Sequence, residues 1–233
     1  MSDYILLAAV LLVLIIGAVK GYKKGFLRLA VWFAGLIAIL FIVTKISPYV
    51  SNYLIDNTSL YDNVRQKIIT AYETGREADI AQDSEMGQTK QNEVIDSFGF
   101  PALIADSLKS NNTSVIYEKL AVSLFRDYIS GYLSALSIKA GTFAGLFILF
   151  ALAELILFTA IKILEKIPVL RTFNRLLGMA CGITLSLVIV WVFFLAVMMF
   201  FGRSFGTWVF AQVRSSRILT YIFNNNILFS LLR

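Results

Sequence analysis

The stretch Tyr4–Val19, YILLAAVLLVLIIGAV, decides the class of this protein. It contains no charged residue and no proline, and as a helix it would cross most of a hydrocarbon core about 30 Å thick. Asp3 precedes it and Lys20 follows it, which is the reverse of the charge order around the apolar region of a secretory signal peptide. The stretch therefore predicts a transmembrane helix, with a signal peptide as the lesser alternative.

Three further apolar blocks follow, and the predicted spans cover residues 4–19, 29–46, 141–164 and 176–201. The connections within the first pair and within the second pair are short, so the four spans are expected to form two hairpins. Hydrophobic residues make up 58% of the chain and charged residues 15%, whereas soluble domains have about 45–50% and about 25%. The expected fold is therefore an all-α polytopic membrane protein with four transmembrane helices.

Residues 47–140 are polar and net acidic, and they separate the two hairpins. Apolar side chains recur there at helical spacing in two rows, which are Leu60, Val64, Ile68 and Tyr72, and then Ile116, Leu120, Leu124 and Tyr128. These rows predict a small helical segment outside the membrane or on its surface, with a flexible linker near residues 75–98. Residues 202–233 combine four arginines with aromatic and aliphatic side chains, which predicts an amphipathic or docked helical tail.

The orientation is predicted from the lysines and arginines of the short connections, because such residues concentrate on the cytoplasmic side. The first connection and its flanks hold Lys20, Lys23, Lys24 and Arg28, and the second holds Lys162, Lys166, Arg171 and Arg175. Both are expected in the cytoplasm, which places the N-terminus, residues 47–140 and the C-terminal tail outside. The arginines of the tail favour the opposite side.

Several functional classes are disfavoured by what the sequence lacks. The chain has no histidine, and its one cysteine, Cys181, lies inside an apolar block. It contains none of the common nucleotide-binding, serine-hydrolase or zinc-protease motifs. The net charge is +6, but no basic stripe interleaved with aromatic residues accompanies it. We therefore expect a protein that is not an enzyme, holds no cofactor or metal, and does not bind nucleic acid.

Glycines spaced by four residues occur at two places. Gly17, Gly21 and Gly25 form the first row, and Gly178 and Gly182, followed by Ser186, form the second. In a helix this spacing places small residues on one face and allows a neighbouring backbone to approach closely. The rows predict a packing seam between helices, and the alternative is the general abundance of glycine in membrane helices.

Glu154 is the one ionisable residue well inside a predicted span. A carboxylate in hydrocarbon is costly, so its presence indicates either a proton or ion path, an anchor between helices, or a protonated acid that serves packing. Few polar residues accompany it, and a transport path usually needs several.

Two motifs carry a resemblance to a known family. Lys24-Gly25-Phe26-Leu27-Arg28 lies between the first two spans, and Asn174-Arg175-Leu176-Leu177-Gly178 with Gly182 opens the last span. Together with Asp3 and the serine-containing tail, they resemble the colicin V production (CvpA) family. The chain departs from the family pattern at Lys24, Leu29 and Ser186 and in the long segment 48–139.

The resemblance implies a multi-pass protein of the bacterial plasma membrane that acts in toxin production or secretion and in envelope maintenance. It implies partners among membrane proteins, or a homo-oligomer in the lipid bilayer, and it transfers no catalytic residue. A small channel or transporter using Glu154 is one alternative. An envelope scaffold, whose outer helical segment binds another protein, is a second.

Overall fold

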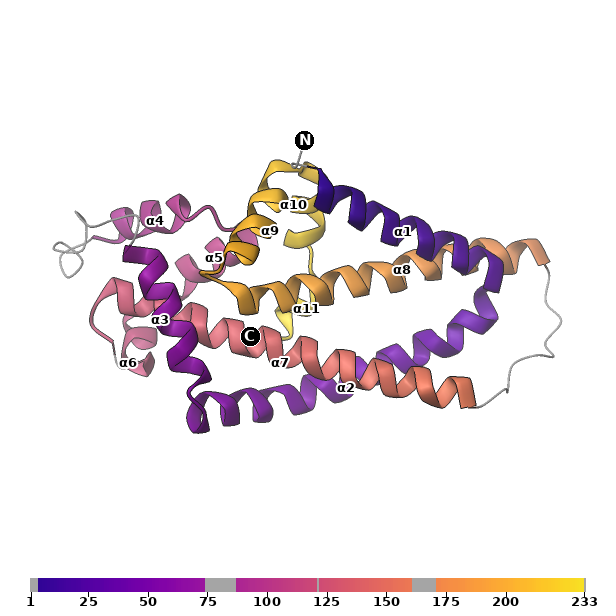
Figure 1. Cartoon of the computed structure of the whole chain (residues 1–233), viewed down its shortest axis with the longest axis horizontal. Helices are drawn as coiled ribbons and strands as arrows, with labels where there is room; N and C mark the ends of the chain where they lie inside the picture. The colour runs from indigo at the N-terminus through magenta and orange to yellow at the C-terminus, as the bar shows by residue number, and fades with distance from the viewer. Residues whose placement is uncertain (1–3, 74–86, 121, 161–170, 233) are drawn as a thin grey trace.

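The computed structural model describes residues 4–73, 87–120, 122–160 and 171–232. These residues form helices and turns and no strand, so the predicted all-α class is confirmed. Four long helices dominate the described part: α1 (Ile5–Lys24), α2 (Phe26–Asn57), α7 (Phe125–Ala160) and α8 (Arg171–Val197) (Figure 1). Each contains a stretch long and apolar enough to cross a membrane, namely Ile5–Lys24, Trp32–Asn57, Phe125–Ile156 and Phe173–Phe200.

Helix α2 continues well beyond residue 46, where the sequence predicted the end of the second span. It runs through Pro48 to Asn57, although proline cannot donate the backbone hydrogen bond to the carbonyl of Thr44. The helix persists because its face around the proline is packed: Val43, Ser47 and Ser51 are buried, and α2 packs along α7. The predicted end of the second span at residue 46 is therefore not the end of its helix.

Helix α7 also begins earlier than expected, at Phe125 rather than near Gly141. Its first turns contain Ser130, Ser134 and Ser137, which fall in the segment 47–140 that the sequence assigned to the polar region between the hairpins. The hydroxyls of these serines are satisfied within the helix: Ser134 donates to the carbonyl of Ser130 at 2.6 Å, and Ser137 to that of Leu133 at 2.7 Å. Serines bonded in this way do not interrupt a buried helix.

The shorter helices lie in the half of the molecule that contains the start of α1 and the end of α8, and together they form a cap (Figure 1). The cap comprises α3 (Leu60–Glu73), α4 (Gln88–Ser97), α5 (Ala102–Asn111) and α6 (Ser114–Leu120), together with the tail helices α9 (Ser204–Ser215), α10 (Arg217–Asn224) and α11 (Ile227–Ser230). A short 3-10 turn, η2 (Met198–Phe200), connects α8 to the tail. The predicted tail is therefore three short helices.

Two sequence expectations for the cap fail where the structure describes it. The linker expected near residues 75–98 includes α4, whose Ile95 is buried; residues 74–86 of that linker lie outside the described residues. The row Ile116–Tyr128 is not one continuous helix, because α6 ends at Leu120 and α7 begins at Phe125. In both places contacts with other helices decide the local structure, and a linear pattern does not contain them.

The long helices that pack most extensively are not neighbours in the sequence. Helix α1 packs along α8, and α2 packs along α7, whereas α1 and α2 diverge from their shared turn and contact one another little (Figure 1). Within their candidate spans only 17% of the residues of α1 and of α2 are buried, so their apolar side chains face outward. Apolar surface of this extent requires lipid or further protein to cover it.

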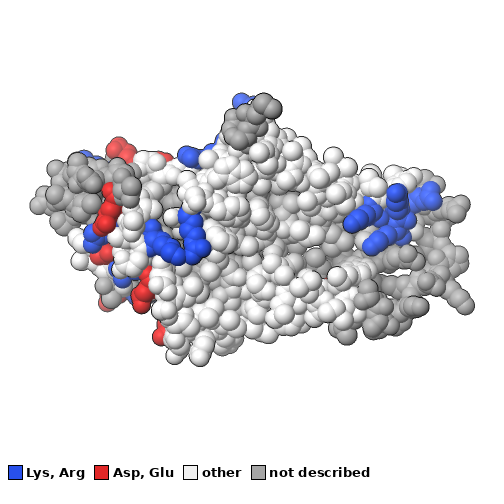
Figure 2. All heavy atoms as spheres, viewed as in Figure 1, with Lys and Arg blue, Asp and Glu red and all other residues white. Residues whose placement is uncertain are grey.

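Charged side chains lie at the two ends of the face shown in Figure 2, and a broad uncharged belt lies between them. One end carries lysines and arginines alone among the described residues on this face, and the cap end carries both signs. An uncharged belt between two charged ends is the charge distribution of a membrane-spanning protein.

Candidate functional site

The two glycine rows identified in the sequence face one another across the contact between α1 and α8. A Cβ atom placed on Gly21 would overlap the carbonyl oxygen of Gly178, and one placed on Gly182 would overlap that of Gly17. Ser186 lies beside Gly17, at the position where the family pattern has a third glycine. The backbones are in direct contact along this seam, so only glycine fits at its central positions. We call the contact of Gly17, Gly21, Gly25, Gly178, Gly182 and Ser186 the glycine seam.

The turn at the end of the seam brings the two family-like motifs together. Gly25 separates α1 from α2 with a φ of 77°, a left-handed conformation that favours glycine. The side-chain amide of Asn174 fills the space where a Cβ of Gly25 would lie. Phe26 then begins α2 and is half-buried. The side chain of Arg28, a further residue of the motif, lies outside the described part of the structure.

Two cations at the same end rest on aromatic rings. The guanidinium carbon of Arg175 lies 5.6 Å from the centre of the Tyr22 ring, and Nζ of Lys24 lies 6.0 Å from that of Trp32. Such contacts contribute about 0.5–1 kcal/mol each at exposed sites. The Arg175 contact links α8 to α1, so this motif residue has a structural role at the seam.

Glu154 lies against Gly35 of the neighbouring helix α2. Its Oε1 atom occupies the space where a Cβ of Gly35 would be, and this buried oxygen has no hydrogen-bond partner among the described residues. None of the described cavities is lined by Glu154. The geometry is that of a side chain packed between two helices.

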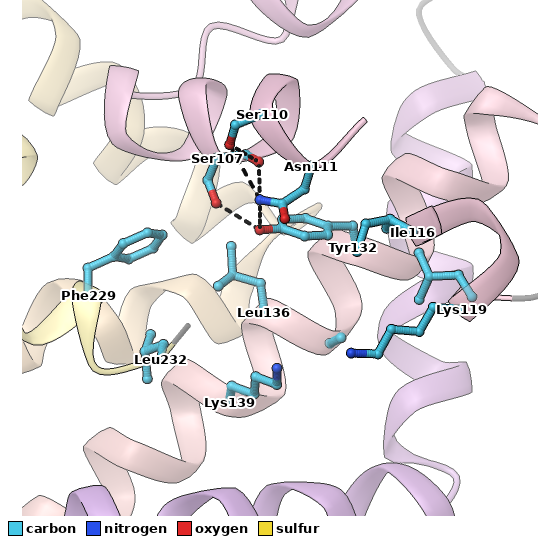
Figure 3. Close-up of a pocket in the computed structure, with 12 residues that line it drawn as sticks. Ser107, Ser110, Asn111, Ile116, Lys119, Tyr132, Leu136, Lys139, Phe229 and Leu232 are labelled. Carbon is cyan, nitrogen blue, oxygen red and sulfur yellow. Dashed lines mark hydrogen bonds between the residues drawn. The ribbon is translucent and has the colours of Figure 1, made fainter. Parts of the chain in front are cut away.

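Sequence reasoning missed a cavity of about 440 Å³ that is lined by α5, α6, α7 and the end of the tail. Figure 3 shows Lys119 of α6 and Lys139 of α7 entering it from different helices. We call this cavity the lysine pocket. It is lined by Ser107, Ser110, Asn111, Ile116, Lys119, Leu120, Tyr132, Ala135, Leu136, Lys139, Phe229 and Leu232.

A hydrogen-bond network forms one wall of the lysine pocket. The hydroxyls of Ser107 and Tyr132 are 2.7 Å apart, and the Asn111 amide donates to the Tyr132 hydroxyl at 3.1 Å and to the Ser107 carbonyl at 2.8 Å (Figure 3). The opposite wall is aliphatic and aromatic. The only sequence signal for this site was Lys139 immediately before an apolar block, and that signal does not distinguish a binding residue from a residue at the end of a span.

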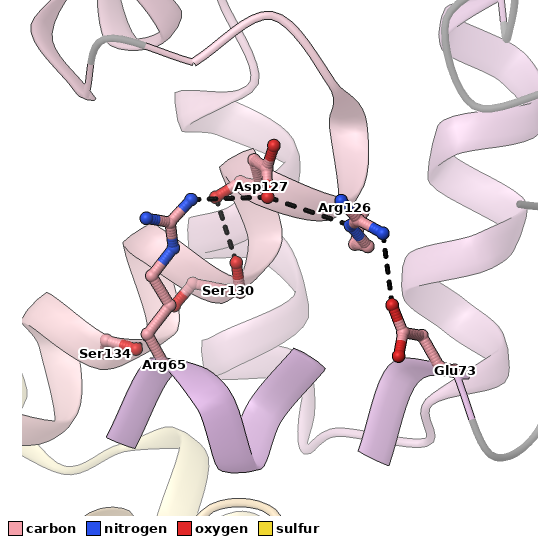
Figure 4. Close-up of polar contacts among 6 residues, drawn as sticks. All are labelled: Arg65, Glu73, Arg126, Asp127, Ser130 and Ser134. Atoms are coloured by element: carbon pink, nitrogen blue, oxygen red, sulfur yellow. Dashed lines mark hydrogen bonds and ion pairs between the residues drawn. The ribbon is translucent and has the colours of Figure 1, made fainter. Parts of the chain in front are cut away.

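Ion pairs fix the cap to α7 near the start of that helix. Arg65 of α3 contacts Asp127 at 3.2 Å, and Arg126 contacts Glu73 of α3 at 3.0 Å (Figure 4). Burial raises the pKa of the nearby Tyr61 hydroxyl, with the Arg65 charge acting in the opposite direction, so Tyr61 is a neutral group in the cap. Partly exposed ion pairs contribute little stability, so these contacts mainly orient α3 on α7.

The remaining candidates have no described role in chemistry. Cys181 is half-buried in α8, and the described residues contain no group of three or more potential metal ligands. The fold and these contacts define a class: a helical protein with four helices able to span a membrane, closed at one end by a helical cap. No family model, no curated protein and no solved structure matches this chain.

Proposed function

We propose that this protein is a multi-pass scaffold of the bacterial plasma membrane, similar in role to the CvpA family in toxin production or secretion and envelope maintenance. The observation that carries the proposal is the glycine seam, where residues of the two family-like motifs contact one another. Asn174 and Gly25, one residue from each motif, are in contact there. Residues that join helices serve architecture, which favours a role in binding partners over chemistry.

In this proposal the two basic turns face the cytoplasm, and the cap lies outside with both ends of the chain. The spans form two hairpins in chain order, and the cap is the part that binds an envelope partner. Support for this role comes from the polar face of α3, where Gln66, Lys67 and Thr70 are exposed and line a shallow depression.

Deletion of the gene in its native host tests the proposal at the level of the cell. We expect reduced export of a peptide toxin or greater sensitivity to envelope stress, with both restored by the wild-type chain. Complementation by Gly21→Leu should fail, because the seam cannot close, and complementation by Gly145→Ala should succeed, because Gly145 has open space around it. A deletion strain that behaves like the parent in both assays would refute the proposal.

The partner surface is tested by photo-crosslinking in intact cells. A photoreactive amino acid at Gln66, on the exposed face of α3, should capture a defined membrane or envelope protein. The same residue at Leu152, which is 53% exposed within a candidate span, is the control and should yield lipid adducts instead. Equal protein capture at both positions, or none at Gln66, counts against the cap as the binding part.

A further inference from the structure

The lysine pocket contains two cations without an anionic partner in the described structure. None of the ion pairs found in the described part of the chain involves Lys119 or Lys139. No carboxylate occurs among the described residues that line the pocket. Two ammonium groups that share a cavity without an acid repel one another, and a bound anion would relieve that repulsion.

The other groups of the pocket fit an anion that carries an apolar part. The hydroxyl of Tyr132 and the side chains of Ser107 and Asn111 supply polar contacts on one side. Leu136 and Phe229 supply apolar surface on the other. The volume of about 440 Å³ lies in the range of about 300–1,000 Å³ that small-molecule sites occupy.

The position of the lysine pocket along the long helices indicates which kind of anion it binds. Lys139 stands immediately before the apolar part of α7, which starts near Gly141. A second cavity of about 140 Å³ shares Lys139 and Leu232 with the lysine pocket and is also lined by Ser47, directly after the apolar part of α2. Two helices thus place the pocket at the boundary between the uncharged belt and the polar cap. Lipid headgroups lie at this level in a bilayer.

We propose that the lysine pocket binds the phosphate headgroup of an anionic phospholipid, held by Lys119 and Lys139, with acyl chains leaving along Leu136 and Leu232. Lysine is a common phosphate ligand, and basic pockets between membrane helices are suited to anionic headgroups. Lipid binding at this pocket requires only that the four long helices span a membrane, so it does not depend on the scaffold role.

The test uses the full-length protein, purified in a neutral detergent and titrated with single lipids in native mass spectrometry. Phosphatidylglycerol should bind to the wild type at least about tenfold more tightly than phosphatidylcholine, because only the former has a net negative charge. Lys119→Gln with Lys139→Gln should lose that preference. Inorganic phosphate is titrated in parallel: tight binding of phosphate alone would identify a free anion as the ligand and overturn the lipid assignment.

A matched control removes the same number of charges from the cap elsewhere. Lys67→Gln with Lys90→Gln changes two exposed lysines outside the pocket and should keep phosphatidylglycerol affinity within about twofold of the wild type. Lys139→Arg retains the charge and should also retain binding, which separates loss of the site from loss of folding. The proposal is overturned if both double variants lose affinity equally, or if the wild type binds the two lipids equally.

Discussion

At the scale of single residues, the glycines of this chain differ in what surrounds them. Gly21 and Gly182 touch backbone atoms of the facing helix, and these cannot move aside without separating α1 from α8. Gly145 in α7 has no atom near the position of a Cβ, although its sequence context is equally apolar. The same residue type therefore has a packing role at the seam and none at Gly145.

Gly21→Ala should lower the free energy of unfolding by about 1–3 kcal/mol, the usual cost of forcing extra volume into a packed contact. Gly145→Ala should leave it unchanged or raise it by up to about 1 kcal/mol, because alanine has the higher helix propensity. Unfolding in sodium dodecyl sulfate, followed by circular dichroism, measures both. Equal effects of the two substitutions would show that the seam is not a close backbone contact.

Glu154 allows a second prediction at this scale. Glu154→Gln keeps the size of the side chain but removes the ionisable carboxyl group. Among the described residues, the buried Oε1 of this carboxyl group has no hydrogen-bond partner. Glu154 lies within the candidate span Phe125–Ile156, and a charged residue inside a span is costly on insertion scales, so the variant should be at least as stable as the wild type.

The same variant tests the transport alternative. Because Glu154 packs against Gly35 between two helices, proton and ion flux through reconstituted liposomes should be the same for the wild type and Glu154→Gln, and no greater than in empty liposomes. Flux in the wild type that is lost in Glu154→Gln would instead assign the protein to the channels or transporters.

At the scale of helices, the tail is attached to α8 by Trp191. Its indole N–H donates to the carbonyl of Ile222 in α10 at 2.9 Å, and the Asn226 amide donates to the carbonyl of Trp191 at 3.2 Å. Leu219 and Phe223 are buried on the same side of α10. The tail is thus part of the folded cap, although its arginines alone favoured the opposite end.

Trp191→Phe should loosen α10 without unfolding the long helices. Loss of this partly buried hydrogen bond, which leaves the Ile222 carbonyl without its indole donor, costs about 1–3 kcal/mol. A cost of about 1.4 kcal/mol corresponds to about a tenfold change in local opening. Tryptic cleavage at the exposed Arg217 should accelerate by about tenfold or more. Trp208→Phe, which changes a partly exposed ring, is the control and should leave cleavage unchanged.

The number and type of the long helices could be predicted from the sequence, because apolar length is a local property. Their ends could not, since Pro48 lies in a part of α2 that packs along α7, and the serines before Gly141 are buried and hydrogen-bonded within their own helix. The glycine rows indicated a seam, but the partner of each row depends on the tertiary arrangement. The lysine pocket was not foreseen, because α5, α6, α7 and the tail each contribute residues that have no pattern in the linear sequence.

At the scale of the whole molecule, the long helices that pack most extensively against one another are not neighbours in the sequence. α1 and α8 come from opposite ends of the sequence and form the closest helix contact, while the cap joins α3 to α7 and the tail to α8. On the face shown in Figure 2, the described charges lie toward the two ends, with a broad uncharged belt between them. The orientation that we propose rests on the excess of basic residues at the two turns, and the arginines of the tail favour the opposite orientation.

The single cysteine makes this orientation directly measurable. In a Cys181→Ala background, new cysteines at Lys23, Asn57 and Asn225 report on the basic turn, the end of α2 and the tail, since all three positions are exposed. A membrane-impermeant maleimide applied to intact cells should label Asn57→Cys and Asn225→Cys, and Lys23→Cys only after permeabilisation. Because the cap holds α2 and the tail together, these two must label alike whichever side they face. Labelling of Asn57→Cys and Asn225→Cys from opposite sides would contradict the fold itself, whereas labelling of Lys23→Cys alone in intact cells would reverse only the orientation.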